Sequence, residues 1–235
     1  MSNTLRMPRI PTAIAQIAPN GKPTARQRRR IIIQMCLRRQ KPGTGSSMEF
    51  LRRRTAMNPW PDLRPILAGI PWVITGAVAT RAYMPERMTQ DLDILVHRAD
   101  CQAVWQRFEA AGYEVSSLLD APLVIVSARS PPGIEVDVIC GEFPWLKEAL
   151  ATPQHDPASY PVLDLPYLIL MKLMANRAID IGDMTRMLGL ASAEELDQVQ
   201  AVVARYSPQD SEDLQALILL GQLEMDPPEG EHWLS

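Results

Sequence analysis

The sequence predicts an α+β fold with α/β-like order: a mixed sheet of about four strands with flanking helices, followed by a C-terminal helical part. Two observations predict this fold. Short runs rich in β-branched residues alternate with helix-forming segments between residues 71 and 140. Beyond residue 166 the pattern is helical. A length of 235 residues is enough for one sizeable core with a small helical domain beside it.

The first 47 residues differ in composition from the rest of the chain. They contain no acidic residue, and residues 1–54 hold 13 Lys and Arg against one acidic residue, although the whole chain carries −3. Such a segment buries too little apolar area to offset its ordering entropy, so we expect a basic, disordered extension. Three interpretations of this extension are open. It is an arm that binds nucleic acid or an anionic membrane surface, or it is an organellar transit peptide. Alternatively, it is not part of the natural protein, which then begins at Met48.

The core of the fold is expected in residues 48–150. Residues 48–68 predict two short helices joined by a proline-broken link. Pro71–Gly76 is a β-branched run ended by glycine, which predicts a buried strand. Ala77–Met84 is rich in helix formers and is stopped by the proline that follows. Asp91–Val96 is predicted to be the next strand.

The remaining elements are predicted from periodicity and end signals. Residues 99–115 form an amphipathic helix that stops at Gly112, and residues 123–140 form two strands around a Pro-Pro-Gly turn. The region 151–235 is expected to be helical, and Ser192 with Glu195 is a capping-box signature. Its helices are predicted over residues 166–177, 192–206 and 207–225.

The spacing of the cysteines and the length of the apolar runs indicate where in the cell the protein is expected to be. Cys36, Cys101 and Cys140 show neither paired nor metal-ligand spacing, which indicates reduced thiols in a cytoplasmic protein. No uncharged apolar run approaches the length of about 18 residues that a membrane span needs, so none is expected.

Two pairs of carboxylates are expected to face one site. Residues i and i+2 of a strand project from the same face, so Asp91 and Asp93 lie together. Two ionised carboxylates this close repel each other, and Mg²⁺, which prefers hard oxygen ligands, resolves the repulsion. Glu135 and Asp137 repeat the arrangement on a second strand. If the two strands are neighbours, three or four carboxylates converge, as two-metal phosphoryl transfer requires.

These carboxylates also have simpler interpretations. Asp91 and Asp93 are alternatively solvated residues at a strand edge or in a turn, and Glu135 and Asp137 the polar face of an ordinary antiparallel strand.

A glycine turn precedes the first carboxylate pair. Gly76 ends a strand and opens a helix at Ala77. The free N–H groups and positive dipole end of a helix N-terminus favour a phosphate, and glycine permits a close backbone approach.

The segment around Lys172 has two interpretations. A continuous helix places Lys172, Asn176, Asp180 and Asp183 on one face, turned towards a site. Alternatively, the helix breaks after Arg177, and Asp180 is an N-cap with a structural role.

The ordered set of these pieces resembles the nucleotidyltransferase superfamily, whose fold is shared by polymerase β, antibiotic nucleotidyltransferases and AbiEii-type toxins. The resemblance is carried by "TGAVATRAYMPERMTQDLDILV", followed about forty residues later by "IEVDVIC". The positions Arg87, Thr89, Asp91 and Asp93 look like the small bacterial subgroup near AbiEii, as does "KLMANRAIDIGD" further on. The similarity covers about residues 70–190 and implies the nucleotidyltransferase fold.

The resemblance also implies roles for individual residues. Asp91 and Asp93 would hold Mg²⁺, one ion or two, and Asp137 would be the third metal-binding and catalytic carboxylate, helping to deprotonate an attacking hydroxyl. The nucleotide-binding residues would be Gly76, Ala77, Arg87, Thr89 and Lys172. Ala77 stands where the family usually has Gly or Ser, so a hydroxyl contact to phosphate is lost.

The implied reaction transfers NMP from an NTP to a hydroxyl of RNA, protein or a small molecule and releases pyrophosphate. The alternative, which Ala77 favours, is a degenerate protein that binds nucleotide or a partner without turnover, as in a toxin–antitoxin component with a cognate antitoxin-type protein. The acidic composition of residues 55–235, with 26 Asp and Glu against 11 Lys and Arg, argues against broad nucleic-acid binding by the catalytic part.

Overall fold

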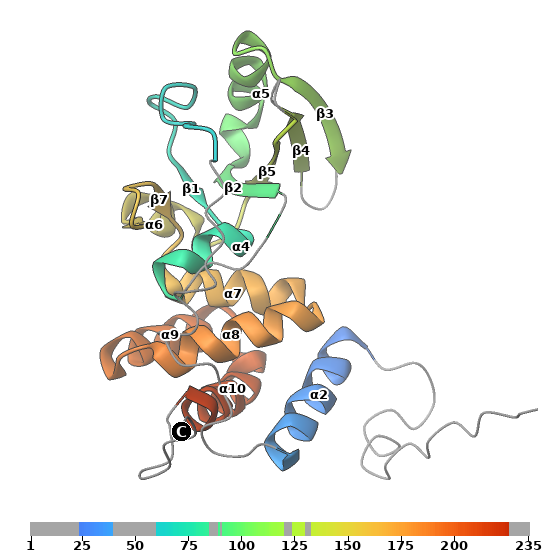
Figure 1. Ribbon diagram of the computed structural model, residues 1–235, viewed down its shortest axis with the longest axis vertical. Helices are drawn as coiled ribbons and strands as arrows, with labels where there is room; N and C mark the ends of the chain where they lie inside the picture. Colours follow the sequence, from blue (N-terminus) through green and yellow to red (C-terminus); the bar gives the residue numbers. More distant parts are fainter. Residues whose placement is uncertain are drawn as a thin grey trace, which may run out of the picture.

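A mixed sheet of seven strands, in the order β3-β4-β5-β2-β1-β7-β6, occupies the upper part of the protein in Figure 1. The computed structural model describes residues 24–39, 60–84, 89, 91–119, 124–129 and 133–225. The strands are β1 (Trp72–Ile74), β2 (Asp91–His97), β3 (Glu114–Leu119), β4 (Val124–Arg129), β5 (Glu135–Gly141), β6 (Gln154–His155) and β7 (Pro161–Val162).

The predicted mixed α+β architecture is confirmed, but the predicted sheet of about four strands is too small. The predicted strands correspond to β1, β2, β4 and β5. β3 extends one edge by pairing antiparallel with β4, and β7 and β6 extend the other edge beside β1. The strands β6 and β7 have two residues each, which is too short for an alternating pattern in the sequence. Only their pairing with neighbouring strands makes them part of the sheet.

The register of the central strands places the carboxylates. β2 and β5 run parallel, with Asp93 opposite Asp137 and Asp91 opposite Glu135. Because neighbouring residues in register share a face, these four side chains leave the same side of the sheet. Cys140, an odd number of positions from Asp137, faces the other side, where it meets helix α5 (Cys101–Ala110).

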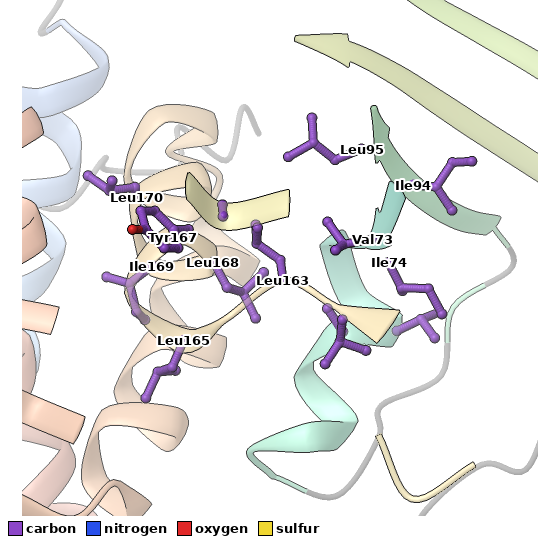
Figure 2. Packing of buried hydrophobic residues seen from close by; sticks show 14 of the residues in the cluster. Val73, Ile74, Ile94, Leu95, Leu163, Leu165, Tyr167, Leu168, Ile169 and Leu170 are labelled. Atoms are coloured by element: carbon purple, nitrogen blue, oxygen red, sulfur yellow. The ribbon is translucent and has the colours of Figure 1, made fainter. Parts of the chain in front are cut away.

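The hydrophobic core lies between the central strands and the first long helix of the C-terminal part. Val73, Ile74, Ile94 and Leu95 on β1 and β2 are at most 1% exposed, and Figure 2 shows Val73 next to Leu163. Beyond it, helix α7 (Leu165–Ala175) contributes Leu168 and its neighbours to the same cluster. The sheet and the helical part therefore share one apolar interior.

The other helices are α2 (Ala25–Arg39), α4 (Gly76–Ala79), α6 (Leu146–Ala151), α8 (Ala178–Leu190), α9 (Ala193–Tyr206) and α10 (Ser211–Met225), with 3-10 turns η1 (Thr80–Ala82), η2 (Arg98–Asp100) and η3 (Pro208–Asp210). The capping box of Ser192 and Glu195 is confirmed at the start of α9. The helix predicted over Ala77–Met84 is only the single turn of α4 followed by η1. Of the two short helices predicted in 48–68, the second is a turn over residues 64–69, and the first lies outside the described residues.

Of the two interpretations of the segment around Lys172, the continuous helix is wrong and the break is confirmed, although Arg177 and not Asp180 is the N-cap. Asn176 takes the left-handed conformation, with φ of 54°, and ends α7. Arg177 is the N-cap of α8, and Asp180 is its third residue, whose carboxylate accepts the Arg177 backbone N–H at 3.1 Å. Asparagine tolerates this conformation better than most residues, which makes the break possible at this position.

Part of the extension expected to be disordered is helical. Residues 25–39 form α2, which lies beside α10 (Figure 1) and buries Ile33 to 1% exposure. Residues 1–23 and 40–47 of that extension, and Met48 after it, lie outside the described residues.

The expectation of three reduced thiols is also wrong for two of them. Cys101 and Cys140 form a disulfide with Cα atoms 5.7 Å apart, while Cys36 is free. A separation of 39 residues gives no sign that α5 packs on β5, so the pairing was not evident from spacing. Among the described residues, no helix combines the length and apolar character needed to cross a membrane.

Candidate active site

Three aspartates converge where β2 and β5 begin. Asp91, Asp93 and Asp137 each place one carboxylate oxygen within 4.8 Å of the others, and all three side chains are half-buried. The cause is the parallel register of β2 and β5, which puts Asp93 directly opposite Asp137. The expectation that carboxylates from the two strands lie close together is thus confirmed.

The electrostatics of this cluster favour a cation. Burial raises the pKa of Asp93 to about 6, and the carboxylates of Asp91 and Asp137 add to the increase. Burial also raises the pKa of Asp137, with a further contribution from Glu135. The buried Oδ1 of Asp137 has no hydrogen-bond partner among the described residues. Crowded carboxylates with an unpaired oxygen are the hard ligands that Mg²⁺ binds.

Gly76 is required for the position of Asp93. Its φ is +65°, in the left-handed region, and a Cβ added there would lie 1.9 Å from Oδ2 and 2.7 Å from Cγ of Asp93. The preceding N–H, of Thr75, donates to the Asp93 backbone carbonyl at 2.9 Å. The glycine turn therefore packs directly against the metal-ligand candidate, and any side chain at position 76 would displace its carboxylate.

The other residues expected around the nucleotide are placed as follows. Ala77 is 5% exposed within α4, so its methyl group points into the protein. α4 has four residues and hence a smaller dipole than the longer helix that the sequence predicts. The Thr89 hydroxyl donates to the Asp91 carboxylate and holds it in place. Arg87 lies outside the described residues.

Glu135 stands next to the cluster but has partners of its own. It lies opposite Asp91 in register, yet it does not belong to the group whose oxygens lie within 4.8 Å. Its carboxylate accepts from the Ser127 hydroxyl at 2.8 Å and lies 3.7 Å from the Arg129 guanidinium. The fourth carboxylate is thus held by β4 rather than by the other three.

Lys172 is buried at 3% exposure rather than presented to a ligand. Its ammonium donates to Asp180 at 3.3 Å and to Asp183 at 2.8 Å. Its positive charge still acts to lower the pKa of Asp93, so it lies near the cluster. Although burial opposes it, the pKa of Asp180 is below its ordinary value because Arg177 donates a hydrogen bond to it and Lys172 adds positive charge. Lys172 therefore joins the start of α8 to α7.

Arg177 was not identified as a site residue from the sequence, although it lies within the "KLMANRAIDIGD" segment. Its side chain is 62% exposed, and its Nε donates to Asp180 at 2.8 Å. The pKa of Arg177 is raised mainly by its hydrogen bond to Asp180, and the Asp93 carboxylate adds to the increase. Arg177 in turn opposes the increase in the pKa of Asp93, so the two groups lie within electrostatic range of each other. It brings an exposed positive charge to the edge of the carboxylate cluster.

Comparison with known proteins gives only partial likenesses. No protein-family model matches the chain, and no curated protein matches it. Among solved structures it is similar to the antibiotic-resistance factor ANT(2'')-Ia, at 15% identity and a TM-score of 0.40, over 66% of this chain and 87% of that one. It is also similar to an antigenic nucleotidyltransferase-like protein from Paracoccidioides brasiliensis, at 16% identity and a TM-score of 0.36, over 70% and 88%. The Cid1 poly(U) polymerase matches at 14% identity and a TM-score of 0.27, over 60% of this chain and 36% of that one.

Proposed function

We propose that this protein is a Mg²⁺-dependent nucleotidyltransferase of the superfamily that its sequence resembles, in the small AbiEii-like subgroup. It transfers NMP from a nucleoside triphosphate to a hydroxyl and releases pyrophosphate. The observation that carries the proposal is the convergence of Asp91, Asp93 and Asp137 beside the Gly76 turn. The carboxylate cluster has no evident structural purpose, since carboxylates that repel one another cost stability.

The residues fit the metal that the reaction needs. Asp91, Asp93 and Asp137 would hold Mg²⁺, one ion or two, through carboxylate oxygens. When bound, Mg²⁺ neutralises the charge that develops on the phosphoryl oxygens and orients the reacting groups. The Thr89 hydroxyl keeps Asp91 in position, and Gly76 leaves the space that Asp93 occupies.

The acceptor hydroxyl needs a base, and Asp137 is the best placed group. Its Oδ1 is buried without a hydrogen-bond partner among the described residues, and its pKa is raised above that of an ordinary aspartate by burial. A carboxylate with a raised pKa accepts a proton more readily during attack. We assign Asp137 this role in addition to metal binding.

The triphosphate meets positive charge at the end of α7 and the start of α8. In the proposed complex, Arg177, exposed at the edge of the cluster, contacts the phosphates directly with its guanidinium. Lys172 acts from within the protein, by its charge and by holding Asp180 and Asp183. Backbone N–H groups at Gly76 and Ala77 and the side chain of Arg87 complete the proposed nucleotide contacts.

A second candidate function is nucleotide binding without turnover. Two observations favour it. Ala77 has no hydroxyl to offer a phosphate, and the ammonium of Lys172 is bound by two carboxylates. In that case the protein is a binding component, for example one regulated by a cognate antitoxin-type protein.

The two functions are separated by transfer of a labelled nucleotide. The full chain is incubated with Mg²⁺, each α-labelled ribonucleoside triphosphate, and RNA, a cell lysate or a small-molecule extract as acceptor. We expect label on one acceptor class, and its loss in Asp137→Asn but not in Asp197→Asn, an equal charge change at an exposed position of α9. Binding of a triphosphate with no label transferred to any acceptor would favour the second candidate. Growth arrest on expression, absent in Asp137→Asn, would support a toxin role.

A further inference from the structure

The N-terminal helix α2 is joined to the C-terminal helices by three arginines. Arg26 contacts Asp210 at 2.9 Å, and Arg30 contacts Asp213 at 3.1 Å. Between them, Arg29 reaches both of these aspartates, at 2.7 Å and 3.0 Å. Figure 1 shows α2 lying beside α10, far from the sheet in the view. This part of the basic extension therefore engages carboxylates of its own chain.

Arg29 differs from its two neighbours in burial and in its third contact. Its side chain is 2% exposed, whereas those of Arg26 and Arg30 are 49% and 38% exposed. Its Nη1 donates to the backbone carbonyl of Leu173 at 2.7 Å. That carbonyl belongs to the last turn of α7, where carbonyls have no partner within the helix. One guanidinium thus ties the end of α7 to α10.

The end of α7 also lies within electrostatic range of the carboxylate cluster. Lys172 precedes Leu173 and holds the first turn of α8, and Arg177 follows after the left-handed turn. Both positive charges act on Asp93. A shift of the Leu173 carbonyl would move both of them, because the turn at Asn176 is a single residue long.

We propose that Arg29 is a positioning residue, through which helix α2 fixes the α7–α8 junction (residues 172–178) against the carboxylate cluster. The inference rests on the proposed function for its effect on nucleotide binding, but the structural link stands on the contacts alone. Three donors of one planar guanidinium match three acceptors, one each on α7, η3 and α10, which a lysine ammonium cannot reproduce in the same geometry.

The experiment compares charge-conserving variants of the full chain. Arg29→Lys keeps the positive charge beside Asp210 and Asp213 but loses the fork that reaches Leu173. Arg26→Lys is the matched control on the same helix, since Arg26 contacts Asp210 and, within the described part of the chain, no residue of α7. A third variant, Arg29→Met with Asp210→Asn and Asp213→Asn, removes Arg29 together with the two carboxylates that it pairs with, in case unpaired aspartates prevent simpler variants from folding.

Two measurements are made on variants that circular dichroism shows to be folded. The first is amide hydrogen exchange across residues 172–178, with residues 214–222 of α10 as the internal reference. We expect the junction in Arg29→Lys to exchange about tenfold faster than in the wild type, with the reference segment unchanged, because opening is local. The second is affinity for each ribonucleoside triphosphate with Mg²⁺, which we expect to weaken about tenfold in Arg29→Lys and to be unchanged in Arg26→Lys.

The outcomes separate this inference from the proposed function. Wild-type exchange across residues 172–178 in both Arg29 variants would overturn the positioning role. Faster hydrogen exchange at the junction with unchanged triphosphate affinity would likewise overturn it, since α2 would then stabilise the fold without affecting the site. A wild-type protein that binds no triphosphate would count against the proposed function, and the exchange result would still decide whether Arg29 holds the junction.

Discussion

Replacing Asp93 by asparagine should make the metal-free protein more stable at neutral pH. The side chain keeps its shape and loses its charge, in a position where burial and the carboxylates of Asp91 and Asp137 all oppose ionisation. In the proposed enzyme this residue is a metal ligand, so the same change should abolish stabilisation by Mg²⁺. A substitution that stabilises the protein while removing its metal response is expected of a functional carboxylate cluster, not of a structural one.

The magnitude follows from the pKa of Asp93. A carboxyl whose pKa rises from 3.8 in the unfolded chain to about 6 in the folded protein destabilises the folded state by about 3 kcal/mol near pH 7. Because the folded pKa is the higher one, the penalty is absent below the unfolded pKa and grows as the pH rises from about 4 to about 6. Asp93→Asn should therefore gain up to about 3 kcal/mol near pH 7 and almost nothing near pH 4.

The assay is urea unfolding of the full chain in a chelating buffer, followed by circular dichroism at several pH values. Asp197→Asn is the control, because it removes one negative charge at an exposed position of α9. Each protein is then measured again with Mg²⁺. We expect the wild type to gain stability with the metal and Asp93→Asn to gain none.

Two results would refute this reasoning. One is a stability difference between Asp93→Asn and the wild type that does not change with pH, since the effect must follow ionisation of the replaced group. The other is an equal gain from Mg²⁺ in both proteins, which would mean that the metal binds elsewhere.

The remaining predictions concern protonation, the glycine turn and helix packing. Mg²⁺ affinity should fall by up to about tenfold per pH unit below about pH 6, because the metal requires the ionised form of Asp93 and its folded pKa is raised; calorimetric titration measures this. Gly76→Ala should cost about 1–2 kcal/mol in urea unfolding for its left-handed backbone, and should also remove the Mg²⁺ response because its Cβ meets Asp93. Gly221→Ala on α10 should destabilise the protein by about 1–3 kcal/mol in the same assay, since its Cβ would lie 2.3 Å from the Thr185 carbonyl oxygen. Gly182→Ala on α8, where an added Cβ has nothing within 4 Å, should instead stabilise the protein by up to about 1 kcal/mol. Equal effects of the two helix substitutions would contradict the close packing of α8 on α10.

Several features could be predicted because they depend on neighbours in the sequence. Alternation along a strand puts Asp91 and Asp93 on one face whatever lies beside them. The capping box of Ser192 and Glu195 forms within a single helical turn. Gly76 was recognised as a turn residue from its place after a β-branched run.

Other features depend on which distant segments meet in space, and local sequence patterns carry no information about such contacts. β7 exists only by pairing with β1, and β6 only by pairing with β7. The disulfide exists only because the first residue of α5 meets β5. The basic composition of residues 25–39 indicated disorder because it was weighed without Asp210 of η3 and Asp213 of α10, which form ion pairs with Arg29 in the fold.

By itself, the sequence determined which residue types could form a metal site and which face of each strand they would occupy, because strand periodicity is a property of the local backbone. Only the tertiary structure decided that β2 and β5 are parallel neighbours, so that Asp137 completes the cluster, and that Gly76 lies against Asp93. It also decided that Lys172 is buried between two aspartates while Arg177 is exposed beside the site. Burial and pairing between distant segments set these outcomes, since the free energy of a charge depends on the groups that surround it after folding.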